Sequence, residues 1–141
     1  MEIVDVNVML CAVNPSAADH GLAKRWLDRA LGGGEPVGLT WVVLLAVIRL
    51  TTRRGLFPRP LSAEEAHGLV RHWVEAPSAV IIHLGQRHLD LLSGLLAEVG
   101  SAGNVTNDAH PAALAIEHGG EVVSFDADFA RFPKLRWSRP S

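Results

Sequence analysis

An α/β fold is predicted for this chain, with helices covering both faces of a mostly parallel central sheet of about four or five strands. Short apolar segments, which we expect to be strands, alternate with longer segments of helical periodicity. Parallel strands need long crossover connections, which a helix usually supplies, so this alternation is typical of a three-layer α/β/α arrangement. The chain has 141 residues, 48% of them hydrophobic, and we expect one domain spanning residues 1–141.

Four apolar segments are strand candidates. Ile3, Val4, Val6 and Val8 predict a short buried strand with Asp5 at or near its carboxyl end. The other candidates are the segments 37–39, 80–82 and 121–125. The last of these is followed by two further aspartates.

Five segments carry the apolar spacing of a helix: 22–31, 41–52, 62–74, 89–99 and a segment that begins at Asp108. The run 41–52 is apolar all round until its end, and its length favours a helix over a strand. Ser62 and Glu65 predict a capping box. We expect Asp108 to be a helix N-cap, which puts Pro111 in the first turn, where its missing N–H costs no intrahelical bond.

Composition narrows the classes of function. The formal net charge of −2 gives no general attraction to nucleic acid or an anionic membrane, so a polyanion would have to meet a local basic patch. Cys11 is the single cysteine, which excludes an intramolecular disulfide and a thiolate zinc cage. The first residues lack the basic segment of a signal peptide, and the apolar run 41–48 is far shorter than the roughly 20 residues of a membrane helix. We expect a cytoplasmic protein that binds no membrane.

Aspartates gather where the predicted strands and helices begin or end. Asp5 and Asp126 follow strands whose carboxyl ends meet at one edge of a parallel sheet, and Asp108 at a helix start can join them. Two carboxylates about 4 Å apart repel by roughly 4 kcal/mol at an effective dielectric near 20, so such a cluster takes up protons or binds a cation. Mg²⁺ or Mn²⁺ fits oxygen ligands best. Taken singly, each aspartate could equally be a solvated strand end, a helix cap or a turn residue.

The segments that hold these aspartates carry a family resemblance. They are 4–8 near the N-terminus, 107–110 before an Ala-rich helix, and 124–129 near the end of the chain. In this order and spacing they resemble PIN-domain proteins, and most closely the VapC-type toxins of bacterial toxin–antitoxin pairs. Further segments that look like this subfamily are 50–52, 57–62 and 130–137.

The resemblance implies a Mg²⁺-dependent or Mn²⁺-dependent ribonuclease with a PIN-like fold, usually a homodimer, that a cognate antitoxin holds inactive. The family's metal-binding aspartates fall on Asp5, Asp108 and Asp126, and Asp128 matches a frequent additional acid. These four residues are the catalytic candidates, and the first three are the metal-ligand candidates.

One departure from the family pattern concerns the helix 41–52. The family usually has a glutamate three residues before an arginine there, whereas this chain has Ala46 before Arg49. An alanine methyl cannot ligate a metal, so the site is one carboxylate short. A catalytically weakened module that binds RNA or a partner protein is therefore an alternative. An Asp-nucleophile phosphatase of the haloacid dehalogenase kind is less well supported, because its second acid would have to stand where Asn7 does.

An RNA substrate also needs groups that bind it. Asn7 could position substrate or water by hydrogen bonding. The densest basic segment includes Arg49, Arg53 and Arg54, and arginine binds phosphate in a bidentate manner. A second basic segment contains Arg131, Lys134 and Arg136. Solvated surface charge or binding of an antitoxin are alternative roles for such segments.

Overall fold

A computed structural model describes residues 1–100 and 103–141 and contains one five-stranded sheet. Its strand order is β3-β2-β1-β4-β5, and every neighbouring pair is parallel. The strands are β1 (Glu2–Val4), β2 (Val37–Leu39), β3 (Ala79–Ile81), β4 (Glu121–Val123) and β5 (Trp137–Ser138). The helices are α1 (Val6–Val13), α2 (His20–Leu31), α3 (Trp41–Thr52), α4 (Ala63–Val74), α5 (His88–Val99), α6 (Val105–Glu117) and a short 3-10 helix η1 (Ala127–Arg131).

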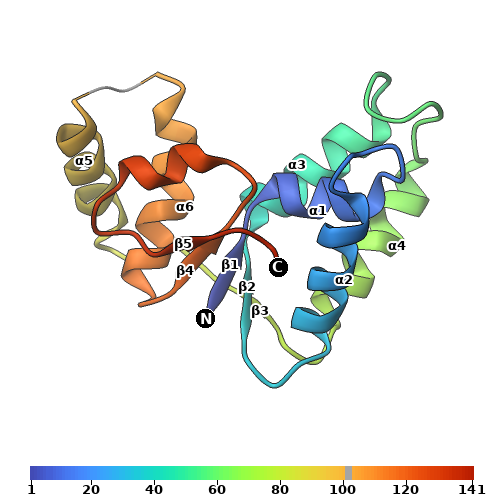
Figure 1. The fold of residues 1–141 in the computed structure, drawn as a ribbon, viewed down its shortest axis with the longest axis horizontal. Coiled ribbons are helices and arrows are strands. Elements are labelled where there is room, and N and C mark those ends of the chain that lie inside the picture. The colour runs from blue at the N-terminus through green and yellow to red at the C-terminus, as the bar shows by residue number, and fades with distance from the viewer. Residues whose placement is uncertain (101–102) are drawn as a thin grey trace.

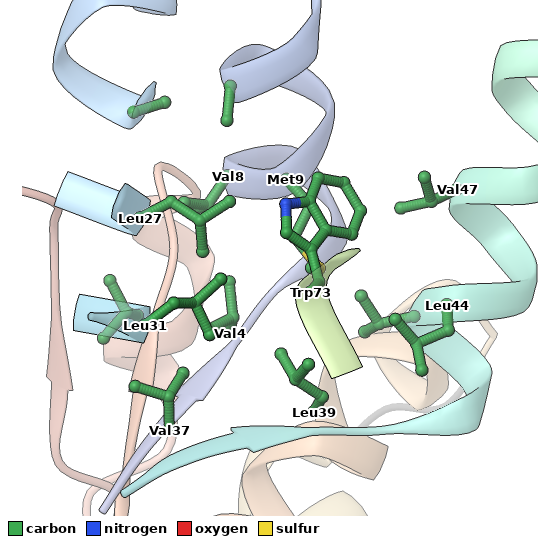
Figure 2. Close-up of a cluster of buried hydrophobic side chains, with 14 of the residues drawn as sticks. Val4, Val8, Met9, Leu27, Leu31, Val37, Leu39, Leu44, Val47 and Trp73 are labelled. Atoms are coloured by element: carbon green, nitrogen blue, oxygen red, sulfur yellow. The ribbon is translucent and has the colours of Figure 1, made fainter. Parts of the chain in front are cut away.

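The sheet separates two layers of helices, as Figure 1 shows: α1 to α4 pack on one face, and α5, α6 and η1 on the other. Alternation along the strands supplies both cores. On β1, Val4 belongs to the core beneath α1 to α4, whereas its neighbour Ile3 belongs to the core beneath α5 and α6. Figure 2 shows the first of these cores, with Trp73 of α4 among the side chains that fill it. The three-layer α/β/α fold class is confirmed.

Gly38 of β2 leaves room for a side chain of the neighbouring strand β1. A Cβ atom placed on Gly38 would come within 3.0 Å of Ile3 Cγ1. That approach is tighter than ordinary van der Waals contact, so the absence of a side chain lets Ile3 pack across the neighbouring strand.

The N-terminal strand is shorter than the prediction. β1 ends at Val4, and Val6 and Val8 lie in α1 instead. Asp5 is the N-cap of this helix, and its side chain accepts a hydrogen bond from the backbone N–H of Val6. The buried residues of α1 (Val8, Met9 and Ala12) follow helical spacing, which a short run of alternating valines did not reveal.

The predicted start of the last helix is also wrong. α6 begins at Val105 with Asn104 as its N-cap, so Asp108 lies inside the first turn and not at the cap. Pro111 is consequently in the helix interior, where its missing N–H leaves the carbonyl four residues earlier without its usual donor. The alanines and other small residues that follow Pro111 are buried against the sheet, and this burial favours continuing the helix through the proline.

Other local predictions are confirmed. α3 spans Trp41–Thr52, with the Thr40 side chain accepting from the backbone N–H of Val43. Both hydrogen bonds of the Ser62–Glu65 capping box are present. Two details differ at the sheet edge: β4 stops at Val123, and the short strand β5 was not predicted. No helix in the described part of the chain is long and apolar enough to span a membrane.

Candidate metal centre

The predicted acidic residues lie around the carboxyl ends of β1 and β4, which are neighbours in the sheet. Asp5 directly follows β1, and Asp126 follows β4 after two residues. Figure 1 shows this end of the two strands at the centre of the molecule, where the α1 to α4 layer and the α6–η1 layer meet. The topology therefore brings together aspartates that are more than a hundred residues apart.

Ser124 organises the buried side of this site. Its hydroxyl is 2.6 Å from Asp5 Oδ2, and the side chain is fully buried. The same oxygen accepts hydrogen bonds from the Asn7 side-chain amide (2.9 Å) and from the backbone N–H of Asp126 (3.0 Å). A hydroxyl has one proton and two lone pairs, and both lone pairs are used by N–H donors. The proton must therefore point to Asp5.

Asn7 has its amide group fixed on both sides. Its Nδ2 donates to Ser124, and its Oδ1 accepts from the backbone N–H of Phe125 at 3.2 Å. The side chain thus ties the first turn of α1 to the end of β4. The sequence analysis expected Asn7 to position substrate or water, whereas in the structure both polar atoms of its amide bond to Ser124 and Phe125 of the protein itself.

Ser124 is the functional residue that sequence reasoning missed. A usable signal was present: Ser124 is a polar residue at the end of an apolar strand and stands two positions before Asp126. A hydroxyl in that place commonly bonds the backbone N–H two residues on.

Three carboxylates form a tight group on the exposed side of the site. Asp108, Asp126 and Asp128 each offer an oxygen, and these oxygens lie within 4.8 Å of one another. Asp126 is the N-cap of η1, and its Oδ1 accepts from the backbone N–H of Asp128 at 2.8 Å. Asp5 lies outside this triplet, although its charge acts on it. All four predicted aspartates thus share one site, with Asp5 set apart by its hydrogen bonds.

The charges in this site act on one another. Burial raises the pKa of the Asp5 carboxyl, the hydrogen bonds from Ser124 and Val6 oppose that shift, and the charge of Asp126 adds to it. Burial also raises the pKa of Asp108, and the negative charges of Asp126, Asp5 and Asp128 raise it further. Both carboxylates would be stabilised by a cation placed among them.

The basic candidates lie at two different places. Arg131 of η1 pairs with Asp128 (Nη2 to Oδ1, 3.4 Å), and its charge partly offsets the rise in the pKa of Asp108. Arg49, Arg53 and Arg54 are exposed near the far end of α3 and make no ion pair within the described residues. A helix of twelve residues is about 18 Å long, so Arg53, which follows the last residue of α3, is far from Thr40 at the helix start.

The donor set fits a hard divalent cation. All the candidate ligand atoms are carboxylate oxygens, which Mg²⁺ and Mn²⁺ prefer, whereas zinc in proteins is bound mainly by nitrogen and sulfur. The mutual repulsion that raises the pKa of Asp108 is the force that such a cation would relieve. Ala46, half-buried on α3, contributes no ligand.

Comparison with known proteins agrees with this fold. Residues 3–135 match the family model of the PIN domain. The chain is 51% identical over 140 residues to Ribonuclease VapC37 of Mycobacterium tuberculosis, with 99% of this chain and 97% of that protein covered. It is 36% identical to Ribonuclease VapC33 of the same species, with 99% and 98% covered.

Solved structures with low sequence identity share the fold. The VapBC2 complex of Rickettsia felis bound to a promoter DNA fragment contains a chain with a TM-score of 0.74 at 17% identity, covering 99% of this chain and 98% of that one. VapC20 of M. tuberculosis, a Sarcin-Ricin loop cleaving toxin, gives a TM-score of 0.70 at 21% identity, with 96% and 99% covered. From the full-length match to the family model and to the VapC relatives, we conclude that the chain belongs to the PIN-domain family and, within it, to the VapC type.

Proposed function

We propose that this protein is a metal-dependent ribonuclease that acts as the toxin of a toxin–antitoxin pair. The observation that carries the proposal is the convergence of Asp5, Asp108, Asp126 and Asp128 at the carboxyl ends of β1 and β4. Asp108, Asp126 and Asp5 would hold Mg²⁺ or Mn²⁺ between them. The relatives named VapC are ribonucleases by name, which supports the same activity here.

The chemistry would be hydrolysis of an RNA phosphodiester. A bound divalent cation would make its water a better nucleophile and stabilise charge on the phosphate. The water oxygen bonds to phosphorus, the bond to the departing ribose oxygen breaks, one water proton is lost, and the departing oxygen gains a proton. Asp128, the most exposed carboxylate of the triplet with 53% exposure, would orient the attacking water. Ser124 and Asn7 would hold Asp5 in place.

The test is cleavage of RNA by purified chain free of antitoxin. Structured ribosomal and transfer RNAs, including a sarcin-ricin stem-loop, would be incubated with Mg²⁺ or Mn²⁺ and separated on denaturing gels. We expect cleavage that is abolished by a chelator and by Asp126→Asn. Cleavage that persists in the variant or in chelator would contradict the proposed metal centre.

The alternative is a binding module weakened by the alanine at position 46. Mg²⁺ keeps several water ligands in proteins, so the site can tolerate one missing carboxylate, and we favour activity for this reason. RNA that stays intact but is retained by the protein in a gel-shift assay would favour the alternative.

An antitoxin partner is proposed because several structural neighbours are toxin–antitoxin complexes.

A homodimer is a second proposal. Trp41, Val42 and Leu84 line a hollow of about 140 Å³, and each is at least half exposed, as is Leu45 one turn further along α3. An uncharged apolar face can meet its own copy across a twofold axis without charge repulsion.

The oligomeric state tests this second proposal. Sedimentation velocity should give a dimer for the intact chain and a monomer for Leu45→Glu, because the substitution places two carboxylates against each other across the axis. If the intact chain is monomeric at micromolar concentration, the homodimer proposal is wrong.

A further inference from the structure

One basic side chain lies at the acidic site itself. Arg131 is at the last position of η1, and Asp128 is three residues earlier. A 3-10 helix has three residues per turn, so side chains three apart stand over one another on the same face. This geometry directs Arg131 to Asp128, with a separation of 3.4 Å between Nη2 and Oδ1.

The ion pair between these residues is weak and open to exchange. The Arg131 side chain is 49% exposed and that of Asp128 is 53% exposed, and exposed pairs contribute little to stability. At 3.4 Å the pair also lies beyond the usual hydrogen-bond length. The guanidinium is thus held beside the carboxylates, and among the described residues Asp128 is its one ion-pair partner, which leaves donors available to another anion.

The acidic site needs a positively charged side chain if it is to bind an RNA phosphate. Four aspartates outnumber the two positive charges of one Mg²⁺, so an RNA phosphate would still approach a negative surface. The arginines at the end of α3 cannot correct this locally, because at 1.5 Å per residue Arg49 lies about 14 Å and Arg53 about 20 Å along the helix from Thr40 at its start. Arg131, by contrast, is close enough to influence the charge of Asp108.

We propose that Arg131 is the residue that binds a phosphate of the RNA beside the metal centre, exchanging Asp128 for a phosphate oxygen when substrate arrives. This inference rests on the proposed nuclease function. Its guanidinium offers two parallel N–H groups to phosphate oxygens, which a lysine ammonium cannot match. Arg49, Arg53 and Arg54 then contact RNA only at a distance from the scissile bond.

The test compares Arg131→Gln and Arg131→Lys with Arg71→Gln. Arg71 is a matched control because it also forms an exposed ion pair on one helix, with Glu75. Three quantities would be measured: RNA cleavage in Mg²⁺, binding of a fluorescent RNA oligomer in Ca²⁺ at several salt concentrations, and Mn²⁺ affinity by calorimetry without RNA.

We expect Arg131→Gln to reduce kcat/KM at least tenfold and to lower the salt slope of RNA binding by about 0.7, the value for one lost phosphate contact on a single strand. Arg131→Lys should restore the salt slope and only part of the rate. Mn²⁺ affinity should be unchanged or higher, because a neighbouring positive charge is removed. Arg71→Gln should match the parent chain in all three measurements.

The possible failures are separable. If the parent chain neither cleaves nor binds RNA, the proposed function fails. If the parent chain is active and Arg131→Gln keeps its rate and its salt slope, the function stands and this inference is overturned. A loss of rate accompanied by weaker Mn²⁺ binding would also overturn it, since Arg131 would then act by supporting the metal ligands.

Discussion

The two sides of the acidic site are built differently. On the buried side, hydrogen bonds fix Asp5: one carboxylate oxygen accepts from Val6 N–H and the other from the Ser124 hydroxyl. On the exposed side, one carboxylate oxygen each of Asp108, Asp126 and Asp128 lies within 4.8 Å of the others, and burial together with the neighbouring negative charges raises the pKa of Asp108. The buried side is therefore ordered before any cation binds, whereas the exposed side is destabilised until one does. Substitutions on the two sides should differ in their effect on stability.

The largest effect is expected from Ser124→Ala. The substitution leaves a buried carboxylate oxygen of Asp5 without its donor and the Asn7 amide without its acceptor. Each unsatisfied buried group costs about 1–3 kcal/mol, and because both hydrogen bonds are only partly buried we expect the lower end of the sum, a loss of about 2–3 kcal/mol in the free energy of unfolding. Urea denaturation in the presence of chelator would measure it.

Ser93→Ala provides the control, because Ser93 is exposed on α5 and should tolerate the change within about 0.5 kcal/mol. A loss for Ser124→Ala as small as that for Ser93→Ala would mean that the buried side is not preordered by hydrogen bonds. The proposed difference between the buried and the exposed side of the site would then be wrong.

In metal-free protein, Asp108→Asn is expected to increase stability, whereas Ser124→Ala decreases it. The pKa of Asp108 is raised in the folded state, so protonation stabilises the fold below the unfolded pKa and that contribution is lost as the pH rises through the folded pKa. At pH 7.5 the charged carboxylate therefore destabilises the metal-free fold. Removing it should raise the melting temperature by about 1–3 °C, and the gain should shrink towards pH 4.

Thermal melts with and without Mg²⁺ sharpen this prediction. If Asp108 is a metal ligand, millimolar Mg²⁺ should stabilise the parent chain more than the variant, reversing their order. Asp90→Asn is a matched control, since Asp90 is likewise an acid in the first turn of a helix and shares the favourable helix-dipole interaction. A higher melting temperature for both variants would assign the effect to something other than the acidic cluster.

The sequence predicted the layers and the residues of the site better than their local geometry. Apolar residues located α3, and the Ser62–Glu65 spacing located the capping box of α4, since both signals depend on neighbouring residues. The prediction failed at Asp5, where tertiary burial decides that the short apolar run after it becomes helix and not strand. It also failed at Asp108, because the helix begins three residues earlier, at Val105. Family resemblance supplied the four aspartates. The hydrogen bond from Asp126 N–H to Ser124 could be predicted, since it joins residues two apart, whereas the bonds of Ser124 to Asn7 and Asp5 could not, because these segments meet only in the folded sheet.

An effect on metal binding alone is expected from Ala46→Glu, which restores the carboxylate that the family pattern usually has. One more oxygen ligand near the exposed carboxylates should tighten Mn²⁺ binding about threefold to tenfold, which corresponds to about 0.7–1.4 kcal/mol in calorimetry. Ala97→Glu, on the exposed surface of α5, adds the same charge away from the site and should change the affinity by less than about twofold. If both variants bind Mn²⁺ like the parent chain, position 46 does not face the metal centre, and the missing glutamate then gives no reason to expect weakened catalysis.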